Sequence, residues 1–144
     1  MILKIFHFLV LLIILVGAGC ADRRDSSANS TAVEADQGIA KAFAEGRSGL
    51  WVQSQGMVEA ILPDDVEGDP HQRFILRLAN GQTLLIAGNI AIAKRIDGLK
   101  IGDTIKFRGQ YEWNNKGGVV HWTHSDPAGR HPGGWLEVHG EKYE

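Results

Sequence analysis

Residues 111–135 concentrate side chains that could bind a ligand. They read YEWNNKGGVVHWTHSDPAGRHPGGW and place aromatic rings among histidines, an aspartate and an arginine. Aromatic rings with polar neighbours suit stacking against sugars, bases or other flat groups. Together with a histidine from an earlier segment, they give a candidate binding surface of ten residues: His71, Tyr111, Trp113, Lys116, His121, Trp122, His124, Asp126, Arg130 and His131.

The spacing of the histidines leaves two interpretations open. His121 and His124 stand three apart, so on a strand they point to opposite faces unless a bulge intervenes. His124, Asp126 and His131 are the better candidate ligands for a divalent metal ion, with His71 approaching from elsewhere. In the other interpretation, Asp126 starts a turn and the histidines only complete hydrogen bonds. We therefore assign no cofactor and no catalytic residue, and keep a divalent metal as the alternative.

Alternation of apolar and polar residues predicts the strands that must position these side chains. Phe74, Leu76 and Leu78 share one face of a strand, and Ile105 and Phe107 share one face of another. The expected strands cover residues 55–62, 73–79, 82–87, 104–111 and 119–124, with a short terminal strand at 133–139.

The connections between these strands also have signatures. Asn80-Gly81 predicts a type I′ hairpin, because both residues tolerate positive φ. Asn89 is expected to cap a short helix over residues 90–99. The acidic loop over residues 63–71 lacks the spacing of a calcium-binding loop and is expected to be a solvated turn. This order predicts a mostly β fold, an OB-fold-like five-stranded Greek-key barrel with a short helix between strands three and four. A flat β-sandwich is the alternative.

The N-terminus reads as an export signal. Residues 1–20, MILKIFHFLVLLIILVGAGC, contain one lysine, an apolar run and small residues before a cysteine. The apolar run is short for a membrane-spanning helix, which needs about 20 residues. The ending resembles the lipobox of bacterial lipoproteins, which implies lipidation of Cys20. Gly17 departs from the usual leucine there, so cleavage without lipidation is the alternative.

Residues 21–48 are expected to be a flexible tether ending in a short helix over 37–46, because 21–36 are small and polar. Residues 49–144 would form the β domain. We therefore expect an exported protein that is lipid-anchored to a membrane and faces the periplasm, or is secreted.

The charge, cysteine content and motifs of the chain limit the classes of ligand that we expect. The chain has 144 residues with a formal net charge of −2, and loss of residues 1–20 would remove only one basic residue. This balance disfavours binding to a phosphate backbone. The single cysteine excludes an intrachain disulfide. No phosphate-binding loop or dinucleotide fingerprint is present.

Six short segments carry a family resemblance. They are HQRF at 71–74, GQTLL at 81–85, YEWN at 111–114 followed by Lys-Gly-Gly at 116–118, HWTH at 121–124, Asp-Pro at 126–127 and Gly-Arg-His at 129–131. With these segments, residues 50–144 resemble a bacterial family of uncharacterised small exported OB-like proteins, a domain of unknown function. The resemblance implies a domain identity and no activity.

Three functions follow from these patterns. The leading hypothesis is a non-catalytic binding or interaction module of the cell envelope, with a glycan, a peptide or another envelope protein as its ligand. The second is a metal-dependent hydrolase, such as a phosphodiesterase or nuclease, in which Arg130 steadies developing negative charge. The third is single-stranded nucleic-acid binding, which the acidic balance and the export signal both disfavour.

Overall fold

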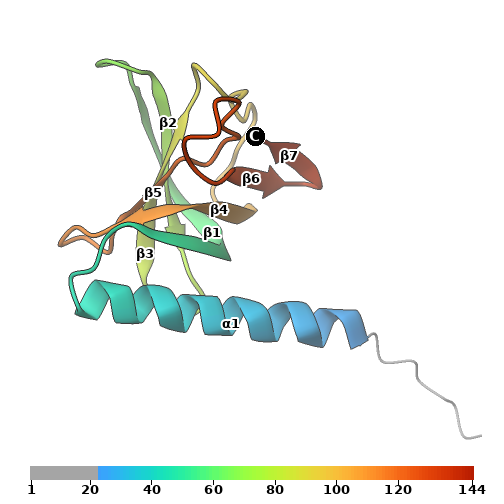
Figure 1. The fold of residues 1–144 in the computed structure, drawn as a ribbon. Coiled ribbons are helices and arrows are strands. Elements are labelled where there is room, and N and C mark those ends of the chain that lie inside the picture. The colour runs from blue at the N-terminus through green and yellow to red at the C-terminus, as the bar shows by residue number, and fades with distance from the viewer. Residues whose placement is uncertain (1–22) are drawn as a thin grey trace, which may run out of the picture.

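One helix and seven strands make up the described part of the chain, residues 23–144, in a computed structural model (Figure 1). The predicted signal peptide, with Cys20, lies outside the described residues. The elements are α1 (Arg23–Ala44), β1 (Leu50–Asp65), β2 (His71–Arg77), β3 (Thr83–Asn89), β4 (Thr104–Glu112), β5 (Val119–His121), β6 (Trp135–Val138) and β7 (Glu141–Tyr143).

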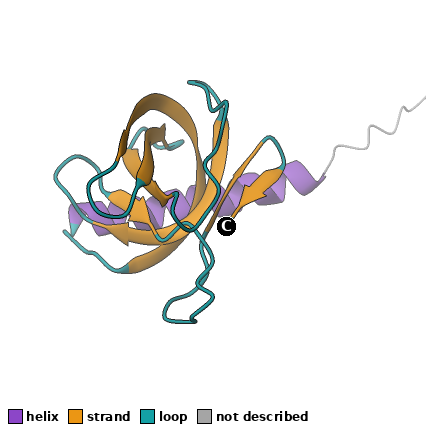
Figure 2. Ribbon diagram, turned by 90° about the horizontal axis from the view of Figure 1, so that it is seen from above, coloured by secondary structure: helices purple, strands orange, loops and turns teal. Residues whose placement is uncertain are grey.

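Five of the strands close into a ring in the order β1-β2-β3-β5-β4, because β1 pairs with β2 and also with β4. Figure 2 looks down onto this ring and shows the strands curving around its interior. β3 and β5 are parallel, and the other pairs in the ring are antiparallel. β6 and β7 continue the sheet from β4 as a hairpin. The predicted mostly β domain is therefore confirmed, with one strand, β7, that the sequence pattern missed.

Apolar side chains fill the ring. Phe74 and Leu76 from β2 and Phe107 from β4 are fully buried, as the alternating pattern predicts. Tyr111 from β4 is also fully buried, and its hydroxyl donates a hydrogen bond to the carbonyl of Gly117 at 3.2 Å. Its place in the predicted binding surface is wrong, because the strand turns this ring into the core.

Residues 90–99 form turns in place of the predicted helix. Asn89 does start a turn, since its Oδ1 accepts a hydrogen bond from the N–H of Ala91 at 2.9 Å. The turn stops because the buried side chain of Gln72 binds both backbone groups of Ile96, each at 2.9 Å. A helix would need those groups for its own hydrogen bonds. Ile96 is nevertheless buried.

The hairpin at Asn80-Gly81 is present, but its turn is not type I′. Gly81 has φ 86°, whereas Asn80 does not have the positive φ that type I′ also requires. Two side-chain bonds fix Asn80. Its Oδ1 accepts from the N–H of Gln82 at 2.9 Å, and its Nδ2 donates to the carbonyl of Asp36 at 3.2 Å. The turn is therefore shaped by its contact with α1.

Helix α1 begins at Arg23, well before the predicted start at residue 37, so the segment expected as a tether is largely helical. Ile39 and Ala42 are buried on its inner face, and so is Asp36. A carboxylate on the inner face interrupts the apolar spacing by which a helix is recognised in a sequence. Within residues 23–144, no helix combines the length and apolarity needed to cross a membrane.

Polar contacts fasten α1 across one end of the ring (Figure 1). The carboxylate of Asp36 accepts hydrogen bonds from Ser54 Oγ at 2.6 Å and from the N–H of Ala79 at 3.1 Å. Near the helix C-terminus, Trp113 Nε1 donates to the carbonyl of Phe43 at 3.0 Å, and the two rings stack. Trp113 therefore secures the helix.

Replacing Asp36 by alanine should destabilise the protein. The change removes the acceptor of two hydrogen bonds and leaves the buried Ser54 hydroxyl unpaired, which costs about 1–3 kcal/mol. Urea denaturation measures the loss. The matched control is Glu34→Ala on the exposed side of α1, expected to change stability by less than about 0.5 kcal/mol. Equal effects of the two variants would show that Asp36 does not fasten the helix.

Candidate ligand-binding pocket

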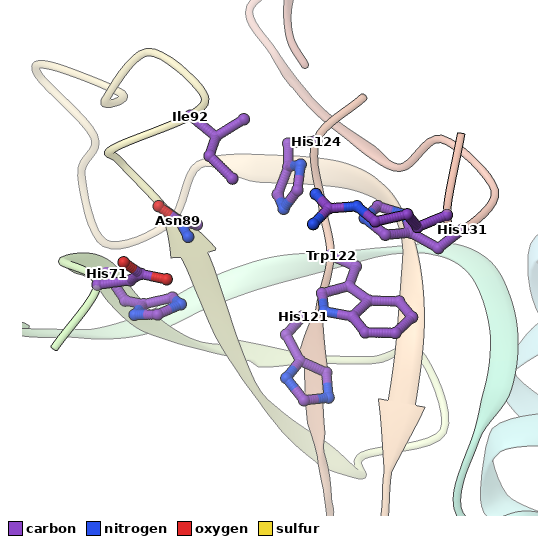
Figure 3. Close-up of a pocket in the computed structure, with 9 residues that line it drawn as sticks. His71, Asn89, Ile92, His121, Trp122, His124 and His131 are labelled. Carbon is purple, nitrogen blue, oxygen red and sulfur yellow. The ribbon is translucent and has the colours of Figure 1, made fainter. Parts of the chain in front are cut away.

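A pocket of about 340 Å³ lies where β2 begins and β3 ends (Figure 3). His71 pairs with Asn89 at this end of the two strands, whereas α1 contacts the hairpin turn at their other end. The pocket and the helix thus occupy opposite ends of the β2–β3 hairpin. The lining residues are Asp69, His71, Asn89, Ile92, His121, Trp122, His124, Arg130 and His131.

The pocket brings together six of the ten residues that the sequence singled out, among them four histidines. His71 opens β2, His121 closes β5, His124 follows shortly after, and His131 lies in the loop before β6. Figure 3 shows these side chains arranged around a common space with Trp122. Residues far apart in the sequence therefore share one site.

A break in β5 explains why His121 and His124 share the pocket. The predicted strand over 119–124 ends at His121, because Trp122 takes a left-handed backbone conformation with φ 53°. Such a residue ends the strict alternation of side chains between the two faces of a strand. The expectation that the two histidines point to opposite faces holds only for an unbroken strand.

Backbone contacts fix the protonation pattern of two imidazoles. His124 is 5% exposed, and its Nδ1 lies 2.7 Å from the carbonyl oxygen of Ser125. His131 Nδ1 lies 2.8 Å from the carbonyl oxygen of Pro132. A carbonyl oxygen only accepts, so each Nδ1 carries the hydrogen. In the neutral ring, Nε2 is then left with a bare lone pair.

The imidazole of His121 lacks a hydrogen-bond partner within residues 23–144 at one of its two ring nitrogens. Its Nε2 is buried and has no hydrogen-bond partner among the described residues. Burial lowers the pKa of His121, the Glu112 carboxylate opposes that shift, and the nearby His71 adds to it. His121 is therefore a neutral ring at neutral pH, with one nitrogen whose hydrogen-bonding capacity is unused.

Aromatic stacking holds one wall of the pocket. The ring of His131 stacks on Trp122 with centroids 4.5 Å apart and on Trp51 with centroids 6.0 Å apart. The guanidinium of Arg108, which belongs to β4, lies over the Trp51 ring at 5.8 Å from its centroid. Trp122 still exposes 39% of its surface, so it offers a flat apolar face beside the histidines.

Asp126 organises the loop that carries Arg130 and His131. Its carboxylate accepts hydrogen bonds from the N–H groups of Ala128, Arg130 and His131, at 3.0, 2.6 and 3.2 Å. The Arg130 side chain, and then the backbone N–H groups of Arg130 and Ala128, hold the pKa of Asp126 far below its ordinary value. The carboxylate thus stays charged and is used within its own loop.

The predicted metal ligands do not assemble. Asp126 Oδ2 approaches His131 Nε2 only to 3.8 Å, and its oxygens already serve the loop. Across residues 23–144, no group of three or more His, Cys, Asp or Glu side chains has the arrangement that would hold a metal ion. Within the trio of His124, Asp126 and His131, the Asp126 carboxylate turns toward the backbone N–H groups of its own loop.

Three predicted surface residues lie elsewhere. Tyr111 is in the core and Trp113 is against α1. Lys116 sits in the turn before β5, where Asn114 Oδ1 accepts hydrogen bonds from the N–H groups of Lys116 and Gly118. Lys116 is therefore held in this turn and does not line the pocket.

Three lining residues were missed by the sequence analysis. Asp69 was expected in a solvated turn, and Asn89 and Ile92 were assigned to a helix that does not form. A signal for Asn89 does exist. Counting outward from the Asn80-Gly81 turn places Asn89 opposite His71 on the paired strand. No comparable pattern identifies Asp69 or Ile92.

Comparison with known proteins gives a family and no activity. A family described as a protein of unknown function (DUF3465) matches residues 24–144. The match includes nearly all of α1, the ring and every residue that lines the pocket. No curated protein matches the chain.

Substitution of Gly134 should displace the pocket wall. The Gly134 N–H donates to the carbonyl of His124 at 2.8 Å, and an added Cβ would lie 1.9 Å from the carbonyl oxygen of Trp122. Gly134→Ala must push these backbones apart, at a cost of about 1–3 kcal/mol. Urea denaturation and the near-ultraviolet circular dichroism of the tryptophans measure the effect.

Gly133→Ala is the matched control. A Cβ at Gly133 would meet only Ser125 Cα at 3.9 Å, an ordinary contact, so stability and the tryptophan signal should stay near those of the parent. If Gly134→Ala were equally harmless, the close packing of this loop against Trp122 would be wrong.

Proposed function

This chain belongs to the DUF3465 family of proteins of unknown function, and we propose that it is a non-catalytic binding module whose pocket holds a small polar ligand. The observation that carries the proposal is the convergence of four histidines on one pocket, where a buried nitrogen of His121 has no partner within residues 23–144.

An unpaired buried nitrogen is a specific sign of a missing partner. A buried polar group without a hydrogen bond costs about 1–3 kcal/mol, so folded proteins pair nearly all of them. His121 also lines a space large enough for a small molecule. A polar ligand atom that reached Nε2 from that space would complete the hydrogen bond and recover this cost.

The walls of the pocket are already held in place without a ligand. The Ser125 carbonyl orients His124, stacking on Trp122 orients His131, and Asp126 holds the loop that carries Arg130. A site ordered in advance loses little conformational entropy when it binds. These constraints favour recognition of a ligand.

The surroundings of His124 support a role without catalysis. Ser125 contacts the imidazole through its carbonyl oxygen, so its hydroxyl is not activated by this ring. A nucleophilic serine would need its hydroxyl within hydrogen-bond reach of a base. The function proposed is therefore capture of a ligand and not its conversion.

The ring also supports a proposal about fold type. The order β1-β2-β3-β5-β4, with β1 shared between two partners, supports the proposal of an OB-like Greek-key barrel. The usual helix between the third and fourth strands is replaced here by turns, and the N-terminal α1 covers an end of the ring. OB barrels commonly bind ligands along their strands and loops.

The cellular location of this module is proposed from the N-terminal residues alone. Residues 1–20 have the pattern of a secretion signal, and Cys20 is the residue a lipid would modify. We place the binding module in the cell envelope, attached to a membrane through Cys20. The ligand would then be a molecule or protein of the envelope.

Nuclear magnetic resonance of the histidine and tryptophan side chains tests the pocket. The probes are sodium sulfate, L-glutamate and N-acetylglucosamine, added separately to the folded protein. At least one should shift the signals of His121, His124 and Trp122 in a saturable way, because these residues line the pocket.

His139 and Trp113 are the internal controls, since both are exposed and neither lines the pocket. Their signals should not follow the titration. Shifts spread equally over the pocket and these controls, or no saturable shift with any probe, would contradict a binding function at this site.

A further inference from the structure

The donors around the pocket suit a negatively charged ligand. Arg130 lies at its edge with 75% of its side chain exposed, and its Nε and Nη2 lie 3.4 and 3.3 Å from the Asp126 carboxylate. Asn89 offers a side-chain amide from the opposite wall. A guanidinium with free N–H groups is the side chain that best binds oxyanions.

His124 supplies a donor only when it takes up a proton. Its Nδ1 hydrogen is committed to the Ser125 carbonyl, so in the neutral ring Nε2 presents a lone pair. A lone pair repels an oxyanion. Protonation of the ring puts a hydrogen on Nε2 and adds a positive charge, which converts the same atom into a charge-assisted donor.

The charged and titratable groups that face His124 are mixed in sign. Asp69 is the single carboxylate among the lining residues, while His71, His121, His131 and Arg130 are neutral or cationic. Asp126 lies 3.8 Å from His131 and balances a charge on that ring. Burial lowers the pKa of His121 and so disfavours the charged form of that ring.

From this arrangement we propose that the pocket binds an oxyanion group, such as sulfate, phosphate or carboxylate, and that binding is coupled to proton uptake by His124. The inference rests on the proposed binding function and specifies its ligand class. Arg130 and Asn89 provide fixed donors, and protonated His124 provides the switchable one.

The neighbouring tryptophan bears on the source of the oxyanion. Trp122 exposes a flat face beside the donors, and the pocket volume of about 340 Å³ exceeds the needs of a free inorganic ion. An oxyanion attached to a flat or apolar group would use both features. Comparison of sulfate with phenyl sulfate distinguishes a free ion from an ester.

Isothermal titration calorimetry at pH 5.5 and pH 7.5 tests the coupling. Sulfate and phenyl sulfate are suitable probes because their own charge is constant over this range. Binding should be roughly tenfold tighter at pH 5.5, the change that titration of one imidazole gives over this interval. Two buffers of different ionisation enthalpy should report proton uptake on binding.

Two variants separate the roles. Arg130→Gln, on the exposed loop, should weaken binding at least about tenfold at both pH values and keep the pH dependence. His124→Gln should abolish the pH dependence. Because replacement of the buried His124 also removes packing, the imidazole signals of the parent protein provide a second readout. Saturating sulfate at pH 7 should shift the His124 signals toward those of the protonated ring. His139→Gln, outside the pocket, is the control.

The outcomes are decisive in both directions. Affinity that is independent of pH or rises with pH, or release of protons on binding, would overturn the inference. Binding of zinc chloride, but not sulfate, at these histidines would also overturn it, since metal ions take the neutral ring. If only N-acetylglucosamine binds, the oxyanion inference fails and the binding function stands. If no probe binds, both fail.

Discussion

Closure of the ring by β1 is the constraint on which the rest of the structure depends. Its first residues pair with β4 and its last residues pair with β2, so a single strand joins both sides of the sheet. This double pairing buries the inner faces of all five strands together. It also fixes the ends of β2, β3 and β5 close to one another, where the pocket forms. The site is therefore a product of topology more than of any local motif.

Much of the barrel could be predicted because its strands obey simple alternation. Phe74, Leu76 and Phe107 face inward as the period of two requires. The predictions from sequence were wrong where a side chain forms long-range hydrogen bonds with another segment. Gln72 bonds Ile96 and removes a helix that local spacing favoured. Asp36 puts a charge on the inner face of α1 and conceals its extent. These long-range contacts have no signature in a local window.

The sequence predicted the region of the pocket but only part of its lining, because contacts between distant segments decide which side chains converge. The density of histidines in the last third pointed to the correct region, and three of them converge with His71, Trp122 and Arg130. Which side chains converge was decided by the left-handed backbone at Trp122 and by the Asp126 loop. Neither follows from residue type alone. Asp126 holds the loop before β6, whereas the imidazoles and Arg130 line the pocket.

The closed ring also bears on how the protein behaves at high local concentration. Open sheet edges invite pairing with another chain, and closure of the ring reduces the length of open edge. In the described residues the sheet ends at β7, a strand of three residues that carries Glu141 and Lys142 on its exposed positions. So short and charged a border is a poor template for strand addition. Ring closure and this short charged border both disfavour fibre-like self-association through strand pairing.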